Sequence, residues 1–124
     1  GPLLSSSPEQ ASGQLYGKAA DVWSCGLMMH EMLTGEHPIW DSKRDDRKKY
    51  KEKLKQITKI ILDENRLKYF NKNSLSFFKM VCDIKSNLRY TCEQALKHPW
   101  ITRDENDKIP LNFYQEVTNF ELAQ

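Results

Sequence analysis

The sequence predicts an all-α domain, and three observations support this prediction. Apolar residues recur at helical spacing in several stretches of the chain. No stretch alternates polar and apolar residues for long enough to form a convincing strand. The 124 residues, of which 39% are hydrophobic and 29% charged, suit one globular domain with a modest core.

The first long helix is expected from about Lys18 to Thr34. Residues 1–17 are rich in Ser, Gly and Pro, so we expect a loop there, with a short turn of helix at Pro8–Ala11. Gly35 is a typical helix stop, and Pro38 beyond it cannot continue the helix.

Further helices are predicted after Pro38. Residues 41–62 begin with charged residues, and Leu54, Ile57 and Ile61 then recur at helical spacing, which predicts an amphipathic surface helix. A third helix is expected over residues 74–83, because Leu75, Phe78 and Cys82 share one face.

A fourth helix is expected to start at Thr91. Thr91 and Gln94 form a capping box, in which each side chain bonds the backbone N–H group of the other residue. This helix is expected to stop at His98-Pro99, and a last helix is predicted over residues 112–123.

The first long helix is apolar around its whole circumference, yet it carries two acids. Asp21, in the first turn, can accept hydrogen bonds from free N–H groups, but Glu31 has the wrong sign for its end of the helix dipole. Glu31 is therefore exposed, paired with a cation or available to a ligand. Few helices remain to cover this helix, so we expect part of its surface to be open and to promote self-association.

The segment Lys43–Lys59 is unusually basic for a chain whose formal net charge is +2. A solvated helix face explains this most simply. A docking surface for an acidic partner, or contact with nucleic acid phosphates, is the alternative. No interleaved aromatic residues or groove-binding motif favour nucleic acid. The cations of this segment are Lys43, Arg44, Arg47, Lys48, Lys49, Lys51, Lys53, Lys55 and Lys59.

Cysteine and histidine usage predicts no metal site and no disulfide framework. Cys25, Cys82 and Cys92 are odd in number and far apart, which is typical of reduced thiols in a cytoplasmic or nuclear protein. The three histidines lie in unrelated contexts, so we expect no metal ligands among them. The longest apolar run is too short to span a membrane, and we expect no signal peptide before it.

Three motifs together resemble the large lobe of eukaryotic protein kinases. Asp21-Val-Trp-Ser-Cys-Gly26, followed by Glu31-Met-Leu-Thr-Gly35, resembles the central helix of that lobe, and Ser7-Pro8-Glu9 resembles the A-P-E motif that closes the activation segment. Arg89-Tyr-Thr91, Gln94-Ala-Leu96 and His98-Pro-Trp-Ile101 resemble the end of the kinase fold, most closely in the calcium/calmodulin-dependent group of Ser/Thr kinases.

This resemblance implies a division of the chain. Residues 7–102 are expected to be the C-terminal portion of a kinase domain, and residues 103–124 a C-terminal extension. Residues 1–6 are expected to combine the end of the activation segment with a remnant of a cleaved purification tag, which Gly1-Pro2-Leu3 resembles.

The resemblance also implies roles for particular residues. The aspartate that Asp21 matches anchors the catalytic loop, and the glutamate that Glu31 matches lies at the peptide-binding groove, where basophilic kinases use it to hold a substrate arginine. Glu36 is a second candidate there. Two structural pairs are implied: Glu9 with Arg89 as a buried ion pair, and Met28 with Met32 in the core, at the base of the apolar column beneath the adenine of ATP. Trp23 and Gly26 complete the structural residues of the central helix motif.

The chain lacks the motifs that phosphoryl transfer needs. It contains no G-x-G-x-x-G loop, no H-R-D and no D-F-G. We therefore expect no catalytic, cofactor-binding or metal-binding residues in this chain, and no activity from it alone, whereas a full-length parent kinase would use Mg-ATP to phosphorylate Ser or Thr of protein substrates. The alternatives are a pseudokinase-type scaffold module, or a small basic helical protein that binds nucleic acid.

Overall fold

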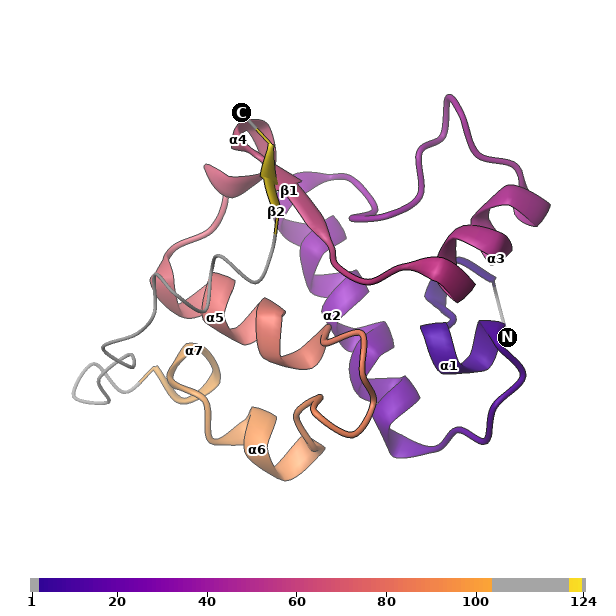
Figure 1. Ribbon diagram of the computed structural model, residues 1–124. Coiled ribbons are helices and arrows are strands. Elements are labelled where there is room, and N and C mark those ends of the chain that lie inside the picture. Colours follow the sequence, from indigo (N-terminus) through magenta and orange to yellow (C-terminus); the bar gives the residue numbers. More distant parts are fainter. Residues whose placement is uncertain (1–2, 104–120, 124) are drawn as a thin grey trace.

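One long helix, α2 (Lys18–Thr34), lies at the centre, and shorter elements surround it (Figure 1). The computed structural model describes residues 3–103 and 121–123. The short elements before α2 are the 3-10 helix η1 (Leu3–Ser5) and α1 (Pro8–Ala11). Those after it are α3 (Arg47–Gln56), β1 (Ile61–Asp63), α4 (Glu64–Leu67), α5 (Lys72–Val81), α6 (Cys92–Leu96), α7 (Pro99–Thr102) and β2 (Glu121–Ala123).

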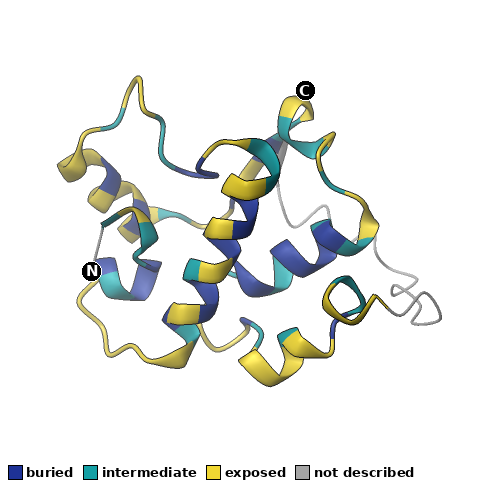
Figure 2. Cartoon of the chain, turned by 180° about the vertical axis from the view of Figure 1, so that it is seen from behind, coloured by how far each residue is buried: buried dark blue, intermediate teal, exposed yellow. Residues whose placement is uncertain are grey.

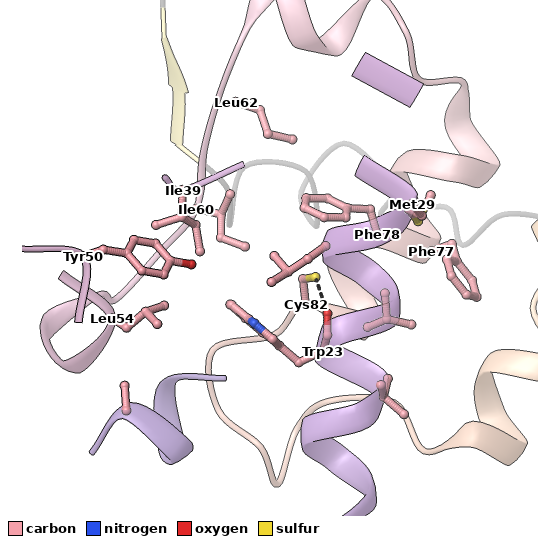
Figure 3. Packing of buried hydrophobic residues seen from close by; sticks show 14 residues of the cluster. Trp23, Met29, Ile39, Tyr50, Leu54, Ile60, Leu62, Phe77, Phe78 and Cys82 are labelled. Carbon is pink, nitrogen blue, oxygen red and sulfur yellow. Dashed lines mark hydrogen bonds between the residues drawn. The ribbon is translucent and has the colours of Figure 1, made fainter. Parts of the chain in front are cut away.

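The core lies where α5 packs across α2 and where α3 packs over α1 (Figures 1 and 3). Gly26 is required at the crossing of α2 and α5. A side-chain carbon at this position would collide with Cys82 Sγ and would lie 2.8 Å from Val81 Cγ2. The absence of a side chain therefore sets how closely the two helices approach. The buried apolar residues around this crossing include Trp23, Leu27, Tyr50, Leu54, Ile60, Leu62, Phe78, Val81 and Cys82.

The predicted bounds of α2 and the turn of helix at Pro8–Ala11 are confirmed. Gly35 ends α2 with a φ of 78°, and its N–H group donates to the carbonyl of Glu31. This left-handed conformation is one that glycine adopts without strain, which explains why the helix stops there.

The predicted helix over residues 41–62 is wrong at both ends. The chain from Asp41 to Asp46 is a loop, and Asp46 caps α3 by accepting a hydrogen bond from the Lys49 N–H group. After Gln56 the chain is extended. Ile60 and Leu62 are buried while Ile61 between them is exposed, which is the alternation of a strand. β1 begins here and pairs in parallel with β2, so the prediction that the chain holds no strand is also wrong.

The remaining helices differ from prediction in their bounds. α5 begins at Lys72 rather than at residue 74, because Asn71 and Ser74 form a capping box in which Ser74 is the third helical residue. The Thr91–Gln94 capping box is present and starts α6. The short helices α4 and α7 were not predicted. Most of the helix predicted over 112–123 lies outside the described residues, and Glu121–Ala123 form a strand.

His30 lies in the core with one of its two ring nitrogens unpaired. Nδ1 donates to the Glu36 carbonyl at 2.7 Å, while Nε2 has no partner among the described residues. The rings of Phe70 and Phe78 pack beside the imidazole, with centroids 5.8 and 5.3 Å away. A protonated His30 would place a second N–H group and a charge against this apolar surface. Burial is the main reason that the pKa of His30 falls from 6.5 to about 4.

Within the described residues, no helix is both long and apolar enough to cross a membrane.

The lowered pKa of His30 predicts that acid destabilises the fold. Below the unfolded pKa of about 6.5 the unfolded chain gains a proton that the folded chain does not accept until the pH approaches about 4. We expect the free energy of unfolding, measured with urea, to fall by about 2 kcal/mol between pH 7.5 and pH 5 because of His30 alone.

The control is His30→Asn, whose amide can still donate to the Glu36 carbonyl but does not titrate. His37 and His98 also have lowered pKa values, so the quantity of interest is the difference in pH dependence between His30→Asn and the unaltered protein. An equal pH dependence in both proteins would contradict the prediction.

Candidate functional site

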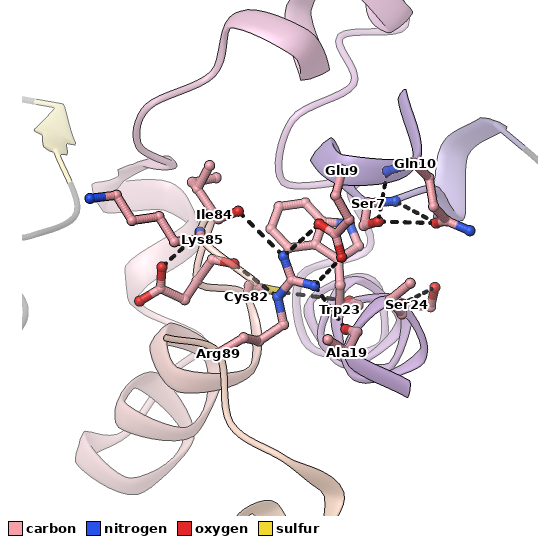
Figure 4. Close-up of polar contacts among 12 residues, drawn as sticks. Ser7, Glu9, Gln10, Ala19, Trp23, Ser24, Cys82, Ile84, Lys85 and Arg89 are labelled. Atoms are coloured by element: carbon pink, nitrogen blue, oxygen red, sulfur yellow. Dashed lines mark hydrogen bonds and ion pairs between the residues drawn. The ribbon is translucent and has the colours of Figure 1, made fainter. Parts of the chain in front are cut away.

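The predicted ion pair between Glu9 and Arg89 is present and buried (Figure 4). Arg89 donates from Nη1 to Glu9 Oε2 at 2.8 Å and from Nη2 to Glu9 Oε1 at 3.0 Å, so the contact is bidentate. The side chain of Arg89 is fully buried and that of Glu9 is 7% exposed. Burial by itself raises the pKa of Glu9, but the hydrogen bonds and charge of Arg89 outweigh burial and hold this pKa below its usual value.

Arg89 also binds three backbone carbonyls. Its guanidinium donates to the carbonyls of Ala19 at 2.8 Å, Asp83 at 2.9 Å and Ile84 at 3.4 Å. All five of its N–H groups thus have an acceptor. The guanidinium lies 5.1 Å from the centre of the Trp23 ring, a distance typical of a cation–π contact. One side chain therefore joins α1, the start of α2 and the loop that follows α5.

Two further contacts, neither of them predicted from the sequence, fix the N-terminal segment. Ser7 caps α1 through a capping box with Gln10, the same Ser/Thr-x-x-Gln spacing that was recognised at the start of α6. The hydroxyl of Ser24 on α2 donates to the carbonyl of Ser5 at 2.7 Å. Only the first of these contacts has a signal in the sequence, because the second joins residues far apart in the chain.

His37 joins the N-terminal segment to the loop after α2. Its Nε2 donates to the Leu4 carbonyl at 2.8 Å, and its Nδ1 accepts the N–H groups of Ile39 and Trp40 at 3.0 and 2.8 Å. The hydroxyl of Tyr50 lies 3.2 Å from Nε2. Burial lowers the pKa of His37, and the neutral ring is the form that can accept at Nδ1.

One face of α2 is open to solvent (Figure 2). Asp21, Cys25, Met28 and Met32 follow one another at helical spacing and are all exposed. Met28 is 61% exposed and Met32 78% exposed, so the expectation that both lie in the core is wrong for this chain. The sequence predicted that part of α2 lacks a cover, and the structure identifies the uncovered part. We call these four residues the α2 stripe.

The two acidic candidates for peptide binding differ in their surroundings. Glu36 forms an ion pair with Arg66, with 3.2 Å between Oε2 and Nε. Glu31 is exposed and forms no ion pair or hydrogen bond through its carboxylate with any described residue. Its negative charge is close enough to favour protonation of His37. Glu31 is therefore the more available of the two carboxylates. Arg66 had no signal in the sequence, since it lies thirty residues from Glu36.

Within residues 3–103 and 121–123, no group of three histidine, cysteine or acidic side chains is arranged to hold a metal ion. The site instead combines a buried polar anchor at Arg89, an open apolar stripe on α2 and a free carboxylate near the end of that helix. Such a set of features suits the recognition of a peptide or another protein surface.

Comparisons with known proteins all find similarity to protein kinases. The family model for the protein kinase domain matches residues 5–101. The chain is 32% identical over 96 residues to calcium/calmodulin-dependent protein kinase type 1 of Macrobrachium nipponense, which covers 77% of this chain and 27% of that protein. It is 31% identical over 101 residues to the calcium/calmodulin-dependent protein kinase type II alpha chain of Drosophila melanogaster, with 80% of this chain and 18% of that protein covered.

A further relative and a solved structure agree with these matches. Serine/threonine-protein kinase chk-1 of Caenorhabditis elegans is 34% identical over 101 residues, covering 81% of this chain and 19% of that protein. The twitchin kinase region of C. elegans has a TM-score of 0.72 at 24% identity and covers 94% of this chain and 20% of that one, which supports the fold. The chain thus spans only 18–27% of the curated relatives named above.

The buried anchor predicts a large loss of stability when Arg89 is replaced. In Arg89→Ala the Glu9 carboxylate stays buried without a partner, and such a loss costs about 3–5 kcal/mol. Arg89→Lys keeps a positive charge but loses the bidentate geometry, so we expect an intermediate loss. Urea unfolding monitored by circular dichroism measures both.

The matched control is Arg66→Ala, which breaks the exposed pair with Glu36 and two long hydrogen bonds, from Arg66 to the carbonyls of Pro38 and Ile61. That pair lies at the surface, so we expect a loss of less than about 1 kcal/mol. If Arg89→Ala and Arg66→Ala destabilise the fold equally, the role given to Arg89 is wrong.

Proposed function

Because this chain belongs to the protein kinase family, we propose that it is the C-terminal part of the large lobe of a Ser/Thr protein kinase domain. The full-length protein would transfer the terminal phosphoryl group of Mg-ATP to serine or threonine hydroxyls of protein substrates. The observation that supports this most strongly is the match of residues 5–101 to the family, together with relatives that are protein kinases, one of them a serine/threonine-protein kinase.

The chain by itself is proposed to be inactive. It contains none of the three motifs that hold ATP and its metal ions or that contain the catalytic aspartate. Residues 7–102 are proposed to form the kinase portion and residues 103–124 an extension. Its exposed and buried thiols are free, which is compatible with a cytoplasmic or nuclear location.

Glu31 is proposed to hold a basic side chain of the substrate peptide. It is exposed, it is not paired with a cation of the described chain, and it lies near the end of the rigid helix α2. A carboxylate placed in this way can accept a bidentate contact from a guanidinium group. Glu36 is the weaker candidate, because Arg66 would have to leave it before a substrate could bind. Asp21, at the other end of the stripe, is proposed to anchor the catalytic loop of the full-length protein.

The proposed role of Glu31 is tested in the full-length protein. We expect Glu31→Ala to raise KM about tenfold for a peptide with an arginine before the phosphorylated serine, with little change in kcat, because an interaction with the bound substrate is lost. A peptide without that arginine should be phosphorylated equally well by both proteins. Incorporation of labelled phosphate measures each rate.

Glu93→Ala is the control, since Glu93 is an exposed carboxylate on a different helix, α6. If Glu31→Ala leaves KM unchanged for both peptides, the role of Glu31 is wrong. If the full-length protein carries no H-R-D or D-F-G motif and transfers no phosphate, the pseudokinase scaffold replaces the kinase as the better proposal.

The α2 stripe is proposed to make this chain self-associate. Two large thioether side chains in water are an unfavourable surface, and burial against a second copy would remove them from solvent. In the full-length protein the rest of the lobe would cover this stripe.

Self-association through the α2 stripe is tested with the isolated chain. We expect sedimentation velocity to show concentration-dependent self-association, and we expect Met28→Glu with Met32→Glu to weaken it at least tenfold. Leu15 and Leu96 are also exposed and apolar but lie outside the stripe, so Leu15→Glu with Leu96→Glu is the control. A monomer at every concentration, or equal effects of the two double variants, would contradict the proposal.

A further inference from the structure

A basic hollow lies between α1 and α3, on a part of the molecule that the proposed kinase function does not use. Its volume is about 440 Å³. Arg47, Lys48 and Lys51 of α3 line one side, and Leu3, Gln10 and Ala11 of the N-terminal segment line the other. α1 and α3 pack against each other at this place, so the hollow is bounded by fixed elements (Figure 1). We propose that this hollow is a docking site for an acidic peptide segment of a partner protein.

The charge of the chain is concentrated around this hollow. Residues 43–59 hold nine cationic and three acidic side chains, a net charge of +6. The whole chain carries only +2, so the rest of it carries −4. A local excess of this size raises the concentration of negatively charged segments near the surface and speeds their association.

The three acids of the segment neutralise other groups and leave the hollow cationic. Asp45 forms an ion pair with Lys53 at 2.7 Å, and Glu52 forms one with Lys55 at 3.2 Å. Asp46 accepts the N–H group of Lys49 as the cap of α3. Arg47, Lys48 and Lys51 form no ion pair with any residue that the structure describes. The cations that line the hollow are thus without a counter-charge among the described residues, as are Lys43, Lys49 and Lys59 outside it.

The cations at the start of α3 are unfavourable for the stability of the helix itself. Arg47, Lys48 and Lys49 are the first three residues of α3, and its first turn holds no acid. The positive end of the helix dipole lies there, so three cations in that turn repel it and one another. A bound carboxylate would relieve both repulsions. This arrangement therefore favours a ligand and gives no benefit to the stability of the isolated helix.

The lining of the hollow favours an acidic peptide over a nucleic acid. Leu3 and Ala11 give it an apolar part that can contact an aliphatic side chain, and none of the described residues that line it is aromatic and able to stack on a base. Arg47 and Lys51 are one helical turn apart, and Lys48 lies three residues before Lys51, so the three charges gather on one side of a helix of about 15 Å. A few closely spaced carboxylates fit this cluster better than a long phosphate backbone does.

The test uses this chain and a fluorescein-labelled peptide of repeated Glu-Glu-Leu units, in a buffer of physiological ionic strength. We expect fluorescence anisotropy to show binding that is weakened about tenfold or more by the combined substitutions Arg47→Gln, Lys48→Gln and Lys51→Gln. The matched control combines Lys43→Gln, Arg44→Gln and Lys59→Gln, which removes the same net charge from the same segment outside the hollow. We expect less than a twofold effect from this control.

A reversed-charge experiment guards against a variant that fails to fold. Arg47→Glu with Lys51→Glu should release the acidic peptide and should bind a labelled peptide of repeated Lys-Lys-Leu units instead. Equal losses in the two glutamine variants, no binding of the acidic peptide, or no gain of the basic peptide would overturn the proposal. So would a single-stranded DNA of equal charge that binds more tightly than the peptide and that loses its affinity in the hollow variant.

Discussion

The structure depends on one buried cation. Arg89 is fully buried and holds Glu9 from α1, Ala19 from α2 and two carbonyls of the loop after α5. A loop carbonyl that is buried without a donor costs free energy, because folding removes the water that it binds in the unfolded chain. An apolar side chain of the same size could fill the space but could not donate to these groups. The five N–H groups of a guanidinium satisfy them from one position.

The need to give buried backbone carbonyls a hydrogen-bond donor also explains the buried histidines. His30 donates to the carbonyl of Glu36 and His37 to the carbonyl of Leu4, so each closes a loop end beside α2. A neutral imidazole suits this role, since it supplies one donor and, in His37, one acceptor without a buried charge. The central helix thus has apolar contacts along its length with α5, and polar contacts where irregular loops meet it. Its stability therefore varies with pH through these two buried imidazoles, whose pKa values burial lowers.

The parts of the fold that could be predicted are those that local chemistry determines. The C-terminal end of α2 follows from Gly35, and the start of α6 follows from the Thr91–Gln94 box. The segment after Pro38 was misread because Ile57 and Ile61 fit a helical period, whereas the buried pair Ile60 and Leu62 reveals a strand only once the core is known. For the site, the Glu9–Arg89 pair followed from the family resemblance. The Glu36–Arg66 pair and the exposure of Met28 depend on tertiary contacts that no spacing encodes.

The α2 stripe and the basic hollow are two surfaces that differ in physical character, and salt separates them. Contact through Met28 and Met32 rests on the burial of apolar area, which ordinary salt changes little and kosmotropic salt strengthens. Contact through Arg47, Lys48 and Lys51 rests on charges at the surface, which are screened within a Debye length of about 8 Å at physiological ionic strength. Association that survives added salt therefore belongs to the stripe, and association that salt abolishes belongs to the hollow.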